Sequence, residues 1–173
     1  KLLLLDEPLG ALDAKIRLEL RTEIRRLVQD LGLTAIHVTH DQSEAMAISD
    51  RIAVMRKGKI LQVGTPQELY LSPNEIFVAN FVGESNFLEG YVESVDDKGS
   101  VLELHGNVHV KVSNKSRSSG EKVVLAVRPE ALELDKGYKK VENALHGRVE
   151  RVKFEGTTTR YDVRLENEDL VVV

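Results

Sequence analysis

Two apolar patterns open the chain and predict a strand followed by a helix. Residues Leu2–Leu5 are four consecutive leucines. A continuous apolar run of this kind is typical of a strand that is buried on both faces in a parallel sheet, where no polar alternation is needed. The next apolar residues are spaced by four, four, three and four positions, which places them on one helix face: Ile16, Leu20, Ile24, Leu27 and Leu31. We expect the solvated side of this helix to carry Glu19, Arg21, Glu23, Arg25 and Arg26.

The ends of this helix and the residues after it predict a parallel crossover. Asp13 can cap the first turn, a role that stabilises a helix by about 1 kcal/mol, and Gly32 can end the helix. A second apolar strand, Thr34–Thr39, follows directly. The order strand, helix, strand predicts two parallel strands joined through the helix. We therefore expect an α/β architecture in this part of the chain.

Local signals predict four further elements before residue 82. Asp41 and Glu44 form an Asp-x-x-Glu helix start, and we expect that helix to reach Ile48. The remaining signals predict, in order, a hairpin around Lys57-Gly58, a helix that begins at the capping box Thr65–Glu68 with Pro66 in its first position, and a helix over 74–81 after a break at Ser72-Pro73.

The pattern changes near Gly83, where helical periodicity gives way to short β segments and polar turns. Residues 88–95 and 145–152 match at five of eight positions, with an offset of 57 residues. Two similar sets of strands that pack into one small barrel would remove exposed sheet edges. We therefore predict two domains, an α/β domain over residues 1–82 and an all-β barrel over residues 83–173.

The composition excludes several classes of protein. Lys and Arg number 24 against 28 Asp and Glu, for a net charge of −4, so the chain has no basic surface to hold nucleic acid. No run of eighteen apolar residues is present, as a membrane-spanning helix would need. The absence of cysteine excludes disulfides and thiolate metal sites.

Candidate catalytic residues lie at the ends of the two predicted parallel strands. Asp6 and Glu7 follow the leucine run, and His40 follows the second strand. Open α/β sheets bind ligands at the carboxyl ends of their strands. Hydrolytic phosphoryl transfer needs a carboxylate that supports Mg²⁺, which fits Asp6, and a group that positions the attacking water, which fits Glu7. The simpler interpretations are a strand-end cap for Asp6, a surface carboxylate for Glu7 and an ordinary loop histidine for His40.

These motifs together resemble the nucleotide-binding subunits of ABC transporters. In that family Asp6 corresponds to the Walker B aspartate, Glu7 to the catalytic glutamate, Gly10–Asp13 to the D-loop and His40 to the switch histidine that senses the γ-phosphate. Further matching segments are similar to the importer branch that handles maltose, polyamines, sulfate and ferric iron: 49–55, 57–60, 64–66 and 77–83. Residues 83–87 resemble the spermidine/putrescine type.

The resemblance implies ATP and Mg²⁺ as cofactors, with Glu7 and His40 catalytic, Asp6 supporting the metal and Asp13 contacting nucleotide across a dimer. The implied partners are a second ATPase subunit, transmembrane permease subunits and, indirectly, a solute-binding protein, on the cytoplasmic face of the inner membrane. The second domain resembles the TOBE-type barrel of the importer branch. An alternative is that this barrel is a ligand-sensing or dimer-bracing module without catalysis.

Two family motifs are absent from the sequence. No Gly-x-x-x-x-Gly-Lys-[Ser/Thr] phosphate loop occurs, and neither does the family's signature loop. We therefore expect that this chain alone neither binds ATP tightly nor hydrolyses it. We also expect that the natural protein continues before Lys1 and that the barrel continues beyond Val173.

Overall fold

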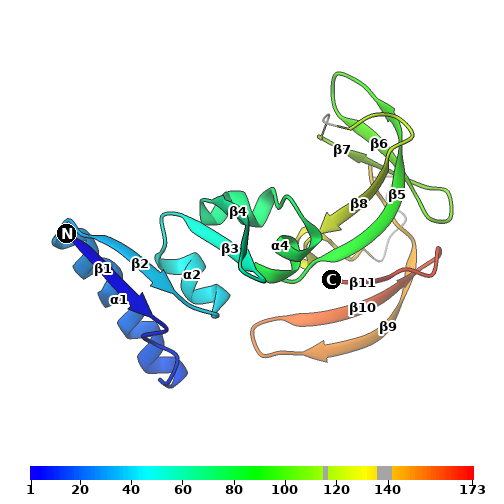
Figure 1. Ribbon diagram of the computed structural model, residues 1–173. Helices are drawn as coiled ribbons and strands as arrows, with labels where there is room; N and C mark the ends of the chain where they lie inside the picture. Colours follow the sequence, from blue (N-terminus) through cyan, green and yellow to red (C-terminus); the bar gives the residue numbers. More distant parts are fainter. Residues whose placement is uncertain (115–116, 136–141) are drawn as a thin grey trace. The chain divides into compact units, whose positions relative to one another are not determined.

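The computed structural model describes residues 1–114, 117–135 and 142–173, and they divide into two compact units, Lys1–Gly83 and Glu84–Val173 (Figure 1). The first unit combines helices with two small sheets, and the second is built almost wholly of strands. None of the described helices is long and apolar enough to cross a lipid bilayer.

The first unit begins with the predicted crossover of β1 (Leu2–Asp6), α1 (Ala14–Asp30) and β2 (Thr34–Val38). The two strands pair in parallel, with Leu2 opposite Thr34 and Asp6 opposite Val38. The expected burial of both strand faces is wrong, because Leu2 is 59% exposed and Leu4 is 67% exposed. The pair has only two strands, and in the part of the chain that the structure describes nothing covers the face that carries these leucines.

Both predicted ends of α1 are confirmed. The Asp13 carboxylate accepts the backbone N–H groups of Lys15 and Ile16, each at 3.0 Å. At the other end Gly32 has a φ of +58°, in the left-handed region that favours glycine. The N–H groups of Gly32 and Leu33 donate to carbonyls of the last turn, as in a Schellman cap.

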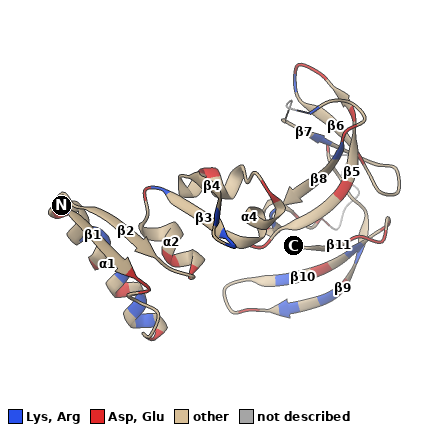
Figure 2. Ribbon diagram, in the orientation of Figure 1, with Lys and Arg blue, Asp and Glu red and all other residues tan. Residues whose placement is uncertain are grey.

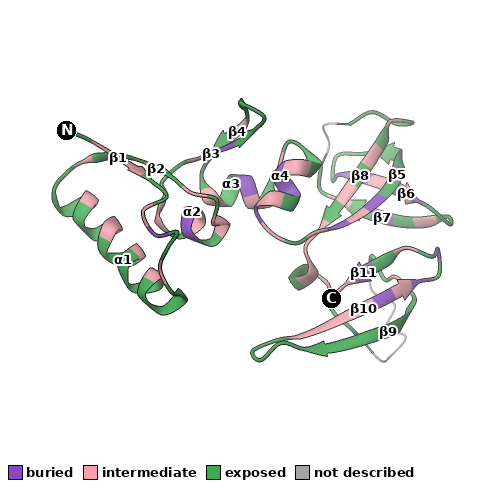
Figure 3. Ribbon diagram, turned by 60° about the horizontal axis from the view of Figure 1, so that its bottom comes forward, coloured by how far each residue is buried: buried purple, intermediate pink, exposed green. Residues whose placement is uncertain are grey.

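The expected solvated side of α1 is wrong for Arg21 and Arg25, whereas Arg26 is exposed as expected. Arg17, Arg21 and Arg25 are four residues apart on one helix face and bind the ends of α2 (Gln42–Ile48). Figure 2 shows the Lys and Arg segments of α1 in blue. Arg21 donates to the Ser43 carbonyl at 3.1 Å, while Arg25 donates to the Ile48 carbonyl and to Asp50. The exposed carbonyls and carboxylates at the ends of a short helix supply the acceptors that a guanidinium requires. In contrast, most of the apolar stripe of α1 is exposed (Figure 3).

The rest of the first unit follows the local signals. Strands β3 (Ile52–Arg56) and β4 (Lys59–Gly64) form an antiparallel hairpin whose turn residues, Lys57 and Gly58, both have positive φ. Helix α3 (Pro66–Leu71) has the complete capping box between Thr65 and Glu68, and α4 (Ile76–Phe81) follows. A small core joins the hairpin to these two helices (Figure 3), and its buried members are Val54, Leu69, Val78 and Val82.

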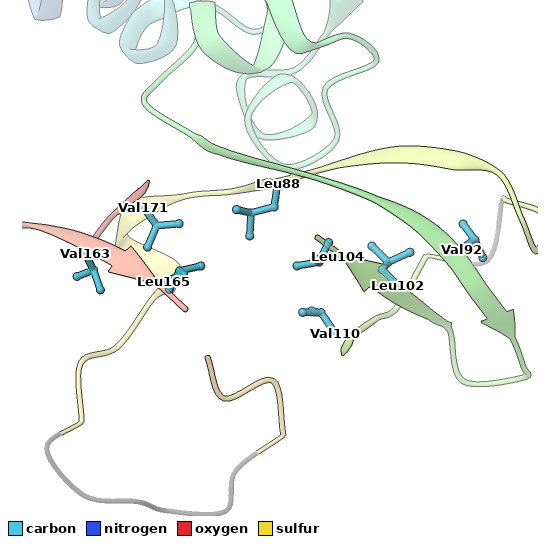
Figure 4. Packing of buried hydrophobic residues seen from close by; sticks show 8 residues of the cluster. All are labelled: Leu88, Val92, Leu102, Leu104, Val110, Val163, Leu165 and Val171. Carbon is cyan, nitrogen blue, oxygen red and sulfur yellow. The ribbon is translucent and has the colours of Figure 1, made fainter. Parts of the chain in front are cut away.

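The second unit contains two sheets that share one core. One has the order β7-β6-β5-β8 and the other β11-β10-β9. The strands are β5 (Asn86–Val95), β6 (Ser100–Leu104), β7 (Val108–Val112), β8 (Lys122–Val127), β9 (Gly147–Phe154), β10 (Thr159–Leu165) and β11 (Leu170–Val172), with a 3-10 turn, η1 (Pro129–Ala131), after β8. Leu88, Leu104 and Leu165 belong to the shared core (Figure 4). Among the described strands these are two separate ladders, whereas a closed barrel was expected.

A buried side chain links the two sheets. The Asn86 amide, on β5, donates to the Val172 carbonyl at 2.8 Å and accepts the Val172 N–H at 2.7 Å. It thereby pairs with the backbone of β11 as another strand would. This pairing satisfies a buried amide that would otherwise be costly to remove from water.

The sequence repeat corresponds to a repeated strand pair. Gly90 lies opposite Leu104 and Gly147 lies opposite Leu165, each in an antiparallel ladder. A Cβ at Gly90 would lie 2.5 Å from the Glu103 carbonyl oxygen, and one at Gly147 would lie 2.7 Å from that of Arg164. Both glycines are therefore required by the close approach of the neighbouring backbone.

Candidate functional site

The carboxyl ends of β1 and β2 bring two of the predicted site residues together. Asp6 ends β1 opposite Val38, and the next residue, Glu7, donates its N–H to the Val38 carbonyl at 2.9 Å. Glu7 has a φ of +44°, a left-handed conformation that is uncommon outside glycine. This conformation turns the chain at the end of the strand.

His40 meets Glu7 at this edge. The His40 Nδ1 lies 3.2 Å from the Glu7 Oε1, within hydrogen-bond distance. Both side chains are accessible to a ligand, with 74% of His40 and 52% of Glu7 exposed. A carboxylate and an imidazole in this geometry can orient a water molecule and donate to an anionic oxygen.

Asp6 and Asp13 lie outside this contact. Asp6 is exposed at the strand end, next to Glu7 in the chain. Asp13 caps α1, and the structure shows no hydrogen bond from it to Glu7 or His40 within the described ranges. No described group of three or more Asp, Glu and His side chains could hold a metal ion by itself. Mg²⁺ needs fewer protein ligands, because one or two carboxylates suffice when phosphate and water complete its shell. The exposed Asp6 carboxylate fits that requirement.

The segment that carries His40 is fixed by Asp41. The Asp41 carboxylate accepts the Ser43 hydroxyl at 2.7 Å, the Glu44 N–H at 3.0 Å and the Arg17 guanidinium at 3.2 Å. The Ser43 hydroxyl, followed by the Glu44 N–H, is the main cause that lowers the pKa of Asp41 from 3.8 to about 2, and Arg21 and Arg17 add to it. The sequence analysis found the cap but missed the arginines, although their spacing of four residues was a usable signal.

A second hydrogen-bond network, which the sequence analysis did not predict, holds the segment that leads to His40. Glu44 is only 2% exposed, and its carboxylate lies 2.5 Å from His37 Nε2 and accepts the Thr39 hydroxyl at 3.0 Å. The predicted Asp-x-x-Glu start is thus half correct. The Asp41 carboxylate accepts the Glu44 N–H, but the Glu44 carboxylate does not accept the Asp41 N–H. The Asp41 N–H instead donates to the Thr39 hydroxyl at 3.0 Å.

The second unit has a pocket of about 200 Å³ between β7, the segment before β9 and the end of β10. His109 and His146 contribute imidazoles, Glu166 a carboxylate, and Val108, Leu145 and Leu165 an apolar wall. His109 also lies 3.4 Å from the Glu93 carboxylate. The mixture of imidazole and apolar surface suits a small polar ligand.

Comparison with known proteins finds relatives that match both units. A family model described as "TOBE domain" matches residues 125–173. The spermidine/putrescine import ATP-binding protein PotA of Thermobifida fusca is 44% identical over 172 residues, which cover 98% of this chain and 45% of that relative. The chain is therefore similar, over nearly its whole length, to part of the import ATP-binding proteins.

Other import ATP-binding proteins match equally fully. PotA of Thermotoga maritima is 42% identical over 96% of this chain and 46% of its own length. The Fe(3+) ions import ATP-binding protein FbpC of Fusobacterium nucleatum is 39% identical over 99% of this chain and 44% of its own length. The chain therefore spans about half the length of the curated relatives it matches. The resemblance to import ATP-binding subunits that the sequence indicated is confirmed.

Proposed function

We propose that this chain is part of the ATP-hydrolysing subunit of an ABC import system. The observation that carries the proposal is the Glu7–His40 contact at the carboxyl ends of two parallel strands. Ligands of open α/β sheets bind at this edge, and hydrolysis of a phosphoanhydride needs a group that orients water there. The likeness to import ATP-binding proteins supplies the nucleotide that these side chains would meet. On this proposal, unit Lys1–Gly83 is part of an ATPase domain.

Glu7 and His40 have different tasks in this mechanism. Glu7 accepts a hydrogen bond from the attacking water and aligns it with the γ-phosphate. His40 donates to a γ-phosphate oxygen through Nε2, while Nδ1 faces Glu7. A neutral imidazole carries only one N–H, so donation at both nitrogens at once requires the imidazolium form. Mg²⁺ would neutralise charge on the phosphates, and the Asp6 carboxylate would hold it through water.

The remaining assignments follow from the relatives and the family. We propose a dimer of ATPase subunits, with Asp13 at its nucleotide-binding interface, coupled to transmembrane permease subunits and indirectly to a solute-binding protein. The subunit would lie on the cytoplasmic face of the inner membrane. Relatives named for spermidine and putrescine import favour a polyamine as the transported solute. Because the sequence has no phosphate-binding loop, the 173-residue chain alone is not expected to hydrolyse ATP.

The substitution Glu7→Gln in the full-length protein tests the proposal. It keeps the shape of the side chain but removes the carboxylate that accepts from water, so turnover should fall by at least about 10²-fold. Equilibrium binding of ATP should be retained. The matched control is Glu19→Gln, which changes an exposed glutamate on α1. Normal turnover by Glu7→Gln would remove Glu7 from the mechanism and, with it, the proposal.

The pocket in the second unit favours ligand sensing as a second candidate function for that unit. Its imidazoles can donate to a small oxyanion, and a protonated oxyanion such as hydrogen phosphate can also donate to the Glu166 carboxylate. An anion that binds there would raise the melting temperature of the chain by mass action. Sulfate and phosphate also stabilise folded chains in general, so the test compares melting curves of the parent chain and His109→Ala over a range of anion concentration. Only the parent should show an additional rise that saturates.

A further inference from the structure

We propose that Glu44 is a positioning residue that holds His40 against Glu7, an inference that rests on the proposed function of these two side chains. Glu44 contacts neither of them. Its two carboxylate oxygens instead bind residues on the segment that leads to His40: His37, within β2, and Thr39, directly before His40.

The burial of Glu44 is the first argument. A carboxylate that is 98% buried is costly to desolvate, and it is tolerated only because both oxygens are paired. Apolar side chains that replace a buried pair are often as stable or more stable. Stability alone therefore does not require a glutamate here, and its geometric effect on the neighbouring loop is the better explanation.

The continuity of the network is the second argument. Thr39 uses its single hydroxyl twice, as donor to Glu44 and as acceptor of the Asp41 N–H. The residues on both sides of His40 are thus tied to one hydroxyl, and that hydroxyl is tied to a buried carboxylate. Among the described residues, the His40 side chain makes no hydrogen bond or ion pair other than the one with Glu7, so its direction is set by this backbone segment.

His37 completes the anchor from the strand. Its Nε2 lies 2.5 Å from Glu44, while its Nδ1 is buried without a hydrogen-bond partner in the described residues. A ring with a proton at Nε2 alone leaves only a lone pair unsatisfied at Nδ1. That tautomer donates to Glu44 and leaves the other carboxylate oxygen to accept from Thr39.

Thr39→Val and Thr39→Ser in the 173-residue chain give the sharpest test. Valine removes the hydroxyl and keeps the branched shape of threonine, whereas serine keeps the hydroxyl. The readout is the His40 imidazole cross-peak in ¹H–¹³C spectra. In the parent chain, Glu7→Gln should displace this peak, because it removes a charge next to Nδ1. In the Thr39→Ser background the displacement should persist. In the Thr39→Val and Glu44→Gln backgrounds it should be lost. Glu23→Gln, an exposed change on α1, is the control that should leave it intact.

An unchanged displacement in the Thr39→Val background would overturn the proposal, and so would its loss in Thr39→Ser. If Glu44→Gln loses the amide dispersion of the folded chain, the two Thr39 variants decide the result by themselves.

Turnover of the full-length protein separates this inference from the proposed function. Thr39→Val should lower kcat by about tenfold or more with KM for ATP unchanged, since misplacement of a catalytic group acts on the chemical step. Thr39→Ser should retain kcat. Loss of the His40 displacement with a normal kcat would support the positioning role and would contradict the role of His40 in hydrolysis.

Discussion

Asp41 shows how strongly a single residue is held beside the candidate site. Its carboxylate receives a hydroxyl, a backbone N–H and a guanidinium, and about a quarter of it remains exposed. Its neighbour His40 is mostly exposed and faces Glu7. Asp41 thus fixes the loop, while the residue before it is free to meet a ligand.

The lowered pKa of Asp41 predicts a pH-dependent stability. The pKa is about 2 in the folded chain against 3.8 ordinarily, so protonation favours the unfolded state. The stabilisation is complete above about pH 4 and is lost as pH falls toward about 2. After allowance for solvent screening, it is about 1–2 kcal/mol at neutral pH.

Asp41→Asn, which keeps a capping side chain, should therefore lower the free energy of unfolding at pH 7 but not at pH 2. Urea unfolding of the parent chain and of Asp41→Asn over this pH range measures the difference between their free energies of unfolding. The contributions of the other carboxylates cancel in this difference. Asp50→Asn is the control, since Asp50 is largely exposed. An equal difference at pH 7 and pH 2 would contradict the assignment.

Residue types at the site could be predicted from the sequence, but the bonds that fix them could not. Glu7 and His40 stood out because each follows an apolar strand, and parallel strands end at one edge. The environment of Glu44 was hidden. A glutamate three residues after a cap predicts that its carboxylate accepts the N–H of the capping residue. Only the fold places His37 and Thr39 within hydrogen-bond distance of the Glu44 carboxylate instead.

At the scale of elements, local chemistry determined the helix ends and turns, while burial depended on tertiary packing. The cap at Asp13, the stop at Gly32 and the Lys57-Gly58 turn each depend on a few adjacent residues, and all three are as predicted. Which face of α1 contacts the rest of the unit is not determined by the local sequence. Its arginines bind acceptors at the ends of α2, and much of its apolar stripe lies open.

The repeated glycines give a prediction at this scale. Gly90→Ala and Gly147→Ala should each destabilise the second unit by about 1–3 kcal/mol, because the new Cβ would overlap a neighbouring backbone carbonyl. Chemical denaturation followed by circular dichroism measures both effects. Ser94→Ala, an exposed change on β5, should alter stability by less than about 0.5 kcal/mol. A neutral effect at both glycines would refute the requirement for close strand approach.

At the scale of the whole molecule, the two halves of the repeat have different surroundings. Val92 on β5 is 1% exposed, whereas its counterpart Val149 on β9 is 44% exposed. The cause is topological: β5 pairs with strands on both sides, but β9 is at the edge of its sheet. The sequence match predicted that the two segments are equivalent strands, and it could not predict which would be covered.

The whole-molecule account depends on Glu7 and His40 acting on the same phosphate. Residues that act as a unit show strongly non-additive losses of activity. The most direct test is therefore a double-mutant cycle on ATP turnover of the full-length protein, with Glu7→Gln, His40→Ala and the two combined. We predict that the double variant is about as slow as the slower single variant. Losses that multiply, as for two independent sites, would contradict the joint action of Glu7 and His40.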